Sequence, residues 1–304
     1  MSDNGTLHRR AGTMAGDGFA VSLSAADAGW AFTSLRVAEL AAGETLQFET
    51  GEDEVIVLPM SGACHVEIDG VEFDLAGRSD VFAGVSDFAY APRDASVMIS
   101  SAQGGRFALP GAHARRRLPI RYQPAEATPV ELRGAGACSR QLVNFCTPQS
   151  FEADRLIAVE AYTPAGNWAT FPPHKHDTDS TSETALEEIY FYEIADGPTG
   201  PGLAYQRVYA ADERLIDVLA EVRSGDVVLI PHGWHGPTMA VPGYDAYWLN
   251  VMAGPGAERA WRVCEDPNHS WVRDTWTKMP IDPRLPLPGF DTGNVVDNPN
   301  WGRS

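Results

Sequence analysis

Short apolar segments separated by turn residues run through most of this chain, and this pattern decides its fold class. Residues 55–58 and 64–68 are typical of β-strands, because apolar side chains alternate or concentrate over only four or five positions. Asp69-Gly70 follows the second segment and predicts a tight hairpin with residues 71–73. Long helical periodicity is hard to find. Many short strands with regular turns predict an all-β protein built as a sandwich or barrel.

The strand pattern occurs twice, and a length of 304 residues allows two domains. The segment 80–87 occupies the place in the first half that 226–233 occupies in the second, which indicates a duplication. Pro124 and Pro129 lie in a stretch that reads as a linker. We expect a polar, frayed N-terminal arm over residues 1–17. The predicted organisation is a first barrel over residues 1–125, a second over 126–280, and an irregular Pro/Gly-rich tail over 281–304.

The charge balance restricts the partners that this chain can have. The formal net charge is −18 and the sequence pI is about 4.7, which argues against nucleic acid and anionic membranes as partners. No apolar run is long enough to span a bilayer, and residues 1–19 lack the apolar core of a signal peptide. The four cysteines show no CxxC spacing. We therefore expect a cytoplasmic protein with reduced thiols.

A metal site is the strongest functional signal in the sequence. On a strand, residues i and i+2 share a face, so His174 and His176 can aim two imidazoles at one point, with Lys175 turned away. Glu188 and His235 follow in later segments. Three imidazoles and one carboxylate suit a divalent first-row metal. The first half has no such pair of histidines, so we expect its barrel to hold no metal.

These motifs resemble those of the cupins, which are double-stranded β-helix barrels of the jelly-roll type. The spacing from His176 to Glu188 is longer than in the commonest cupins, and only Trp234 separates Gly233 from His235. Both departures match a narrower family. The second half is similar to the 5-deoxy-glucuronate isomerases of myo-inositol catabolism. The match is dense over residues 130–272 and looser over 43–100. Its motifs are Pro-Pro-His-Lys-His-Asp, Leu-Glu-Glu-Ile-Tyr-Phe-Tyr, Tyr-Gln-Arg-Val-Tyr, Gly-Asp-Val-Val-Leu-Ile-Pro-His-Gly-Trp-His, Tyr-Trp-Leu-Asn-Val-Met-Ala-Gly-Pro and Asp-Pro-Asn-His-Ser-Trp.

The resemblance implies an all-β bicupin, with two jelly-roll barrels in tandem and one divalent metal per chain. Zinc is the first expectation, with manganese, iron, cobalt and nickel left open by the ligand types. The implied ligands are His174, His176, Glu188 and His235. Glu188 is preferred over Glu187 because strand alternation places it on the face of the following tyrosines, but a register shift of one residue would exchange the two glutamates.

The implied reaction converts the aldose 5-deoxy-D-glucuronate to the ketose 5-dehydro-2-deoxy-D-gluconate. A proton must leave the carbon beside the aldehyde, and a divalent metal would stabilise the charge that builds on oxygen. Tyr190, Tyr192, Glu183 and His232 are candidates for general acid/base catalysis. The tyrosines have an equally simple interpretation as barrel core, and His232 as a turn residue. A metal-promoted hydride shift, which needs no base, also stays open.

The implied substrate is a small anionic sugar acid, whose carboxylate a guanidinium can bind bidentately. Arg140 and Arg207 are the expected anchors and Lys175 is a third cation, although each arginine is equally explained by a structural ion pair. Two other functions compete with the isomerase: an Fe(II)-dependent cupin dioxygenase and a non-catalytic sugar-binding cupin. Exposed edge strands in such a fold favour a homo-oligomer.

Overall fold

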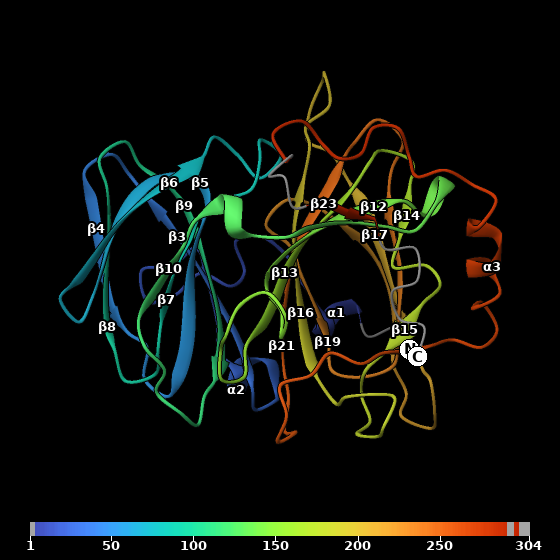
Figure 1. The fold of residues 1–304 in the computed structure, drawn as a ribbon, viewed down its shortest axis with the longest axis horizontal. Helices are drawn as coiled ribbons and strands as arrows, with labels where there is room; N and C mark the ends of the chain where they lie inside the picture. The colour runs from blue at the N-terminus through green and yellow to red at the C-terminus, as the bar shows by residue number, and fades with distance from the viewer. Residues whose placement is uncertain (1–3, 291–294, 298–304) are drawn as a thin grey trace.

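The computed structural model describes residues 4–290 and 295–297, which form two β-barrels side by side (Figure 1). The predicted all-β fold is confirmed. In the first barrel, the long strand β5 pairs with β7 and β9 over its first half and with β6 and β8 over its second. The strands of this barrel are β2 (Val21–Leu23), β3 (Thr33–Leu40), β4 (Glu44–Glu49), β5 (Asp53–Ile68), β6 (Val71–Arg78), β7 (Phe88–Ala91), β8 (Ser96–Ser101), β9 (Gly105–His113) and β10 (Arg121–Gln123).

The second barrel consists of an eight-stranded and a six-stranded sheet that face each other. Its strands are β11 (Val130–Arg133), β12 (Arg140–Cys146), β13 (Ile157–Thr163), β14 (Trp168–Ala169), β15 (His174–Lys175), β16 (Glu187–Ile194), β17 (Ala204–Tyr209), β18 (Asp217–Val222), β19 (Val227–Ile230), β20 (Trp234–Ala240), β21 (Ala246–Ala253) and β22 (Cys264–Glu265). The helical segments of the chain are all short: α1 (Asn4–Leu7), α2 (Ala25–Ala28), α3 (Val272–Trp276), η1 (Ala125–Ala127) and η2 (Gly136–Cys138). Among the described residues, no helix has the length and apolar character needed to cross a membrane.

The predicted hairpin at Asp69-Gly70 is confirmed, since Ile68 of β5 pairs directly with Val71 of β6. Asp69 has a φ of 48° and Gly70 a φ of 81°. A two-residue turn with both central residues at positive φ has the twist that antiparallel strands require, and Asp-Gly tolerates that conformation at low cost.

Strand β16 contributes to two cores because its side chains alternate between two faces. Ile189 and Phe191 lie in the hydrophobic core that joins the two barrels. Tyr190 and Tyr192 lie in the interior of the second barrel. Glu188 is on the same face as these tyrosines and is almost completely buried. The alternation expected from the sequence therefore orients this strand correctly.

The two barrels pack through one continuous apolar core. It is formed by side chains from β3, β5 and β7 of the first barrel and from β12, β16 and β21 of the second. The rings of Phe88 and Phe145 meet across it edge to face, with centroids 5.6 Å apart. Because this core is apolar and extensive, the barrels form one unit and do not move as independent domains.

Buried charges join the barrels next to this apolar core. Arg78 of the first barrel forms a buried ion pair with Glu160 of the second. The guanidinium also donates to the hydroxyl of Tyr162 at 3.0 Å, and the hydroxyl of Tyr247 donates to Glu160 at 3.0 Å. Glu54 makes a second connection by accepting hydrogen bonds from the backbone amides of residues 154, 155 and 156. These partners compensate the cost of burying the charges.

Both ends of the described chain lie on the second barrel. Strand β1 (His8–Arg9) pairs with β19, and the His8 ring lies 2.8 Å from Asp226, so the expectation of a frayed arm over residues 1–17 is wrong there. Strand β23 (Val295–Asp297) pairs in parallel with β11. Residues 281–290 contain no strand, and the rest of the predicted tail, 291–294 and 298–304, lies outside the described residues. The boundary predicted near residue 125 falls in η1, between β10 and β11.

The buried pair between the barrels yields a stability prediction. Replacing Glu160→Gln keeps the shape but leaves the Arg78 guanidinium buried without its counter-charge, which is expected to lower the free energy of unfolding by about 3–5 kcal/mol. Urea denaturation followed by tryptophan fluorescence measures the loss. The double variant Arg78→Met/Glu160→Leu removes both charges and should lose less than the single variant. A loss below about 1 kcal/mol in Glu160→Gln would contradict a stabilising role for the pair.

Candidate metal centre

Three histidines, on or directly after two paired strands, converge inside the second barrel. His174 of β15 pairs directly with His235 of β20, and their ring centroids are 4.4 Å apart. His176 follows β15 and its ring centroid lies 4.8 Å from that of His235. One ring nitrogen from each of the three lies within 4.8 Å of the other two, and all three side chains are buried. The His-x-His spacing and the later histidine therefore meet at one point.

Glu188 completes this group from β16. Its Oε2 lies 3.0 Å from Nε2 of His176 and 3.2 Å from Nε2 of His235. The other oxygen, Oε1, accepts a hydrogen bond from the side-chain amide of Asn250. Burial by itself would raise the pKa of Glu188, but the two histidines outweigh it and lower the pKa to about 2. The carboxyl group is thus held as an anion that faces the histidines.

Glu187, the alternative ligand, points away from the histidines. Its carboxylate accepts hydrogen bonds from the backbone amides of Ala31, Phe32 and Thr33, at the start of β3 in the first barrel. It therefore joins the two barrels on the outer face of β16. Of the two glutamates, only Glu188 faces the histidines, and its role as a metal ligand stays a prediction.

The four side chains fit a divalent metal ion. The Nδ1 atoms of His176 and His235 each face a backbone carbonyl at 3.3 Å, those of Leu186 and Gly233. This arrangement favours the tautomer that leaves Nε2 free to bind a metal. Nε2 of His235 is buried and has no hydrogen-bond partner among the described residues, although Glu188 is near. Three neutral imidazoles with one anionic carboxylate are a suitable donor set for zinc and for other first-row divalent ions.

A small cavity of about 20 Å³ lies next to this group. His174 and two arginines are among the residues that line it. Tyr190 and Trp248, which also line it, stack with their ring centroids 6.1 Å apart. The residues that line it are Arg133, Arg140, Leu142, Ala161, Thr170, His174, Tyr190, Trp248, Asn250 and Trp261.

Arg140 is the available cation in this cavity. It is buried, and its only hydrogen bond among the described residues goes to the carbonyl oxygen of Cys138, with no carboxylate partner. Burial, together with the nearby charges of Arg133 and Arg273, lowers its pKa to about 9. Arg133, by contrast, forms a two-point ion pair with Glu131. A buried guanidinium without a carboxylate partner is suited to an anionic ligand.

Arg133, Asn250 and Trp261 line the cavity but were not recognised as site residues in the sequence. Arg133 pairs directly with Arg140 across β11 and β12. The glycine at 134, with a φ of 84°, was the available signal, because it ends β11 before the chain turns back. Asn250 pairs with Tyr190 across β21 and β16. Trp261 lies in the irregular segment before β22, where no sequence pattern predicts the direction of its side chain.

The acid/base candidates occupy different places. Tyr190 lines the cavity, and burial near Glu188 raises its pKa well above the usual range. Tyr192 lies deeper in the barrel and donates to the side chain of Gln206 at 3.0 Å. Glu183 accepts hydrogen bonds from Lys175, and His232 lies in the turn between β19 and β20. Tyr190 is the only one of these four that borders the cavity.

Two of the three expected substrate cations lie away from the histidines. Lys175 is turned outward, as alternation predicts, and pairs with Asp177 and Glu183. Arg207 is on the face of β17 opposite Gln206 and pairs with Asp217 at 2.5 Å. Neither side chain borders the cavity, and the expectation that Lys175 and Arg207 hold a substrate carboxylate stays a prediction.

Comparison with known proteins agrees with this fold and identifies the family. The model of the KduI/IolB family matches residues 6–272. The chain belongs to this family. A curated 5-deoxy-glucuronate isomerase from Geobacillus kaustophilus is 38% identical over 85% of this chain and 92% of its own length. The enzyme of the same name from Geobacillus thermodenitrificans is 37% identical, over 85% and 93%.

Solved structures support the same architecture for this KduI/IolB member. An IolB-like protein from Salmonella typhimurium matches with a TM-score of 0.80 and 32% identity, over 88% of this chain and 99% of that one. Bacillus subtilis oxalate decarboxylase matches with a TM-score of 0.55 at 12% identity, over 80% and 74%, which shows a likeness of fold alone. The bicupin fold, with its tandem jelly-roll barrels, is thereby confirmed.

The two adjacent glutamates provide a matched test of the metal centre. Glu188→Gln removes the anionic ligand, so the protein is expected to lose most of its bound metal after dialysis. Glu187→Gln changes only the contact with the first barrel and should keep about one metal ion per chain, as the wild type does. Elemental analysis of the dialysed proteins measures the content. Equal metal loading in both variants would show that Glu188 is not a ligand.

Proposed function

We propose that this protein is an aldose–ketose isomerase of myo-inositol catabolism that converts 5-deoxy-D-glucuronate to 5-dehydro-2-deoxy-D-gluconate. The curated relatives named 5-deoxy-glucuronate isomerase support the reaction. One structural observation carries the proposal for this chain. His174, one of the three clustered histidines, and Arg140, which has no carboxylate partner among the described residues, line the same small cavity. A sugar acid offers a carbonyl to the first and a carboxylate to the second.

Arg140 is the proposed anchor of the substrate carboxylate. Its guanidinium presents several N–H donors in one plane, which match the two oxygens of a carboxylate. The burial that lowers its pKa also strengthens its attraction to an anion, because little water screens the pair. Arg133 adds positive charge from the neighbouring strand while Glu131 holds it in place. These two side chains orient one end of the sugar acid.

The reactive end of the sugar would lie between His174 and Tyr190. A divalent ion held by His174, His176, Glu188 and His235 would polarise the substrate carbonyl as a Lewis acid. The chain itself supplies the Tyr190 hydroxyl at the cavity wall, as a group that exchanges a proton with substrate oxygen. The aromatic pair of Tyr190 and Trp248 excludes water from the reacting atoms.

Trp261 is proposed to separate the site from its entrance. It lines the inner cavity of about 20 Å³ and also an outer cavity of about 340 Å³ bordered by Glu131, Asn144 and Gln149. The inner cavity has room for little more than one water molecule, so a hexose-sized substrate needs a side chain to move. Arg133 borders both cavities as well, but its ion pair holds it. Movement of Trp261 would connect the two spaces.

The proposal also covers the resident metal, the oligomeric state and the location of the enzyme. We infer zinc as the resident metal, since three imidazoles and a carboxylate are typical of zinc sites. A homo-oligomer is supported by the edge strand β18, where Leu219 is 58% exposed, and by Leu215 before it, which is 88% exposed. A cytoplasmic location follows from the proposed metabolic role. Sedimentation analysis of the purified protein tests the oligomeric state.

The reaction itself is tested by turnover of 5-deoxy-D-glucuronate with metal analysis on the same samples. The wild type is expected to isomerise the sugar, and His176→Ala should lose both metal and turnover, because it removes a ligand from the polarising centre. The sample is also placed in an oxygen electrode with a catechol and with a thiol. Turnover that survives metal loss would overturn the metal-dependent mechanism. Oxygen consumption without isomerisation would favour a dioxygenase.

The carboxylate anchor is tested by a pair of arginine variants. Arg140→Ala is expected to raise KM by about 10–100-fold, because a charge-assisted hydrogen bond contributes about 1.5–3 kcal/mol. Arg207→Ala removes an arginine on the outer face of β17 and should change KM by less than about twofold. Steady-state kinetics with thermal unfolding of each variant make the comparison. A larger effect at Arg207 than at Arg140 would restore Arg207 as the anchor.

A further inference from the structure

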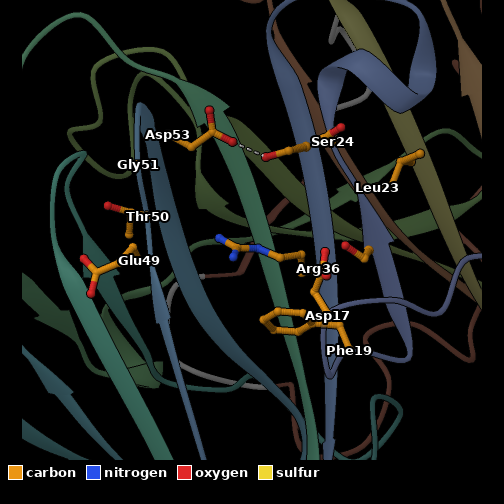
Figure 2. A pocket seen from close by; sticks show the side chains of 11 residues that line it. Asp17, Phe19, Leu23, Ser24, Arg36, Glu49, Thr50, Gly51 and Asp53 are labelled. Atoms are coloured by element: carbon orange, nitrogen blue, oxygen red, sulfur yellow. Dashed lines mark hydrogen bonds between the residues drawn. The ribbon is translucent and has the colours of Figure 1, made fainter.

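The first barrel has a cavity of its own, of about 320 Å³. Figure 2 shows Arg36 reaching into it from β3 toward Glu49 and Thr50, with Phe19 alongside. Asp53, at the start of β5, closes another side of the cavity. The space is similar in size to ordinary small-molecule sites.

This cavity lies at the barrel end that corresponds to the metal centre of the second barrel. β5 pairs with β7 and β9 as β16 pairs with β19 and β21. Val55 pairs with Ala91, the last residue of β7, and Glu188 pairs with Ile230, the last residue of β19. Val55 therefore stands where the second barrel has its carboxylate. Asp53 lies two residues earlier, on the same face and nearer the opening.

Arg36 is a cation held by aromatic rings. β3 directs Leu35 and Val37 into the core between the barrels and Arg36 to the opposite face, into the first barrel. The guanidinium carbon lies 4.4 Å from the ring centroid of Phe48 and 5.1 Å from that of Phe19. Within the described residues the guanidinium group of Arg36 has no ion pair and no hydrogen bond. Ring contacts hold its position and leave its N–H donors available to a ligand.

Acceptors surround this donor. The carboxylates of Asp17, Glu49 and Asp53 line the cavity, and so does the hydroxyl of Ser34, which donates to Asp53 at 2.6 Å. Three carboxylates against one guanidinium give the cavity a net negative formal charge, which repels anions. The guanidinium among them disfavours a metal ion. Neutral hydroxyl groups can use both kinds of partner, because each hydroxyl donates one hydrogen bond and accepts others.

We propose that the opening of the first barrel binds a neutral polyol of about hexose size. Arg36 donates to ligand oxygens, the carboxylates of Asp53 and Glu49 accept from ligand hydroxyls, and Phe19 provides an apolar wall for the carbon skeleton. The first barrel would thus take a neutral polyol without a metal. Under the proposed function the second barrel takes an acid through Arg140, and polyol binding in the first barrel does not depend on that function.

The matched sugars D-glucose and D-glucuronate test the proposal, because they differ only in a hydroxymethyl or carboxylate at one carbon. Isothermal titration uses full-length Arg140→Ala, so that the anion anchor of the second barrel is removed. D-Glucose is expected to bind at one site with a Kd of about 1–10 mM. D-Glucuronate should bind at least about tenfold more weakly, because the carboxylates repel it. Failure of D-glucose to bind below about 50 mM, or stronger binding of D-glucuronate, would overturn the proposal.

Two variants in the same background locate the binding. Arg36→Ala and the surface variant Glu49→Gln are each expected to weaken D-glucose binding by about tenfold, as loss of a charged hydrogen-bond partner does. Glu49→Gln keeps the test valid if Arg36→Ala does not fold. His176→Ala, added as a control in the second barrel, should leave D-glucose binding unchanged. Binding that is lost in the His176 variant and kept in both first-barrel variants would place the sugar in the second barrel.

Discussion

The opposite faces of strand β16 connect the stability of this protein to its chemistry. Ile189 and Phe191 pack into the apolar core between the barrels, while Glu188 and Tyr190 face the candidate metal centre. Because the side-chain period of a strand is two, the packing of one face determines the direction of the other. A shift of one residue would turn Ile189 and Phe191 toward the histidines and Glu188 toward the first barrel. The core between the barrels therefore positions the metal-facing carboxylate.

Much of the fold and part of the candidate site could be predicted because their signals are local. The Asp69-Gly70 turn requires positive φ angles at both residues, which few residue pairs tolerate. These two residues alone therefore predict a hairpin. His174 and His176 share a face by periodicity alone. The same rule favours Glu188 over Glu187, and Glu188 is the one whose carboxylate faces the histidines. Each of these predictions needs only a strand and its alternation.

The features that sequence reasoning missed depend on contacts between distant segments. Strand β1 pairs with β19 across more than two hundred residues, and its own composition reads as a polar arm. Trp261 lies in an irregular segment whose path is determined by what surrounds it. From the sequence alone, Arg207 is as suitable as Arg140 for binding an acid, because both lie on strands in polar motifs. The two arginines differ in the face of the strand that carries them: Arg140 on β12 lines the cavity, and Arg207 on β17 does not. Which face is turned inward depends on the assembled barrel.

The pairing of β1 with β19 affects the order in which the chain can fold during and after its synthesis. A ribosome releases the N-terminal segment first, yet the partner strand of His8 and Arg9 ends at Ile230 and emerges only after the whole first barrel. The first barrel can form before β1 has its partner strand. The second barrel then closes last, with that segment added to the edge of its larger sheet. Contacts of such long sequence separation slow folding, so the final docking of this segment is a natural late step in maturation.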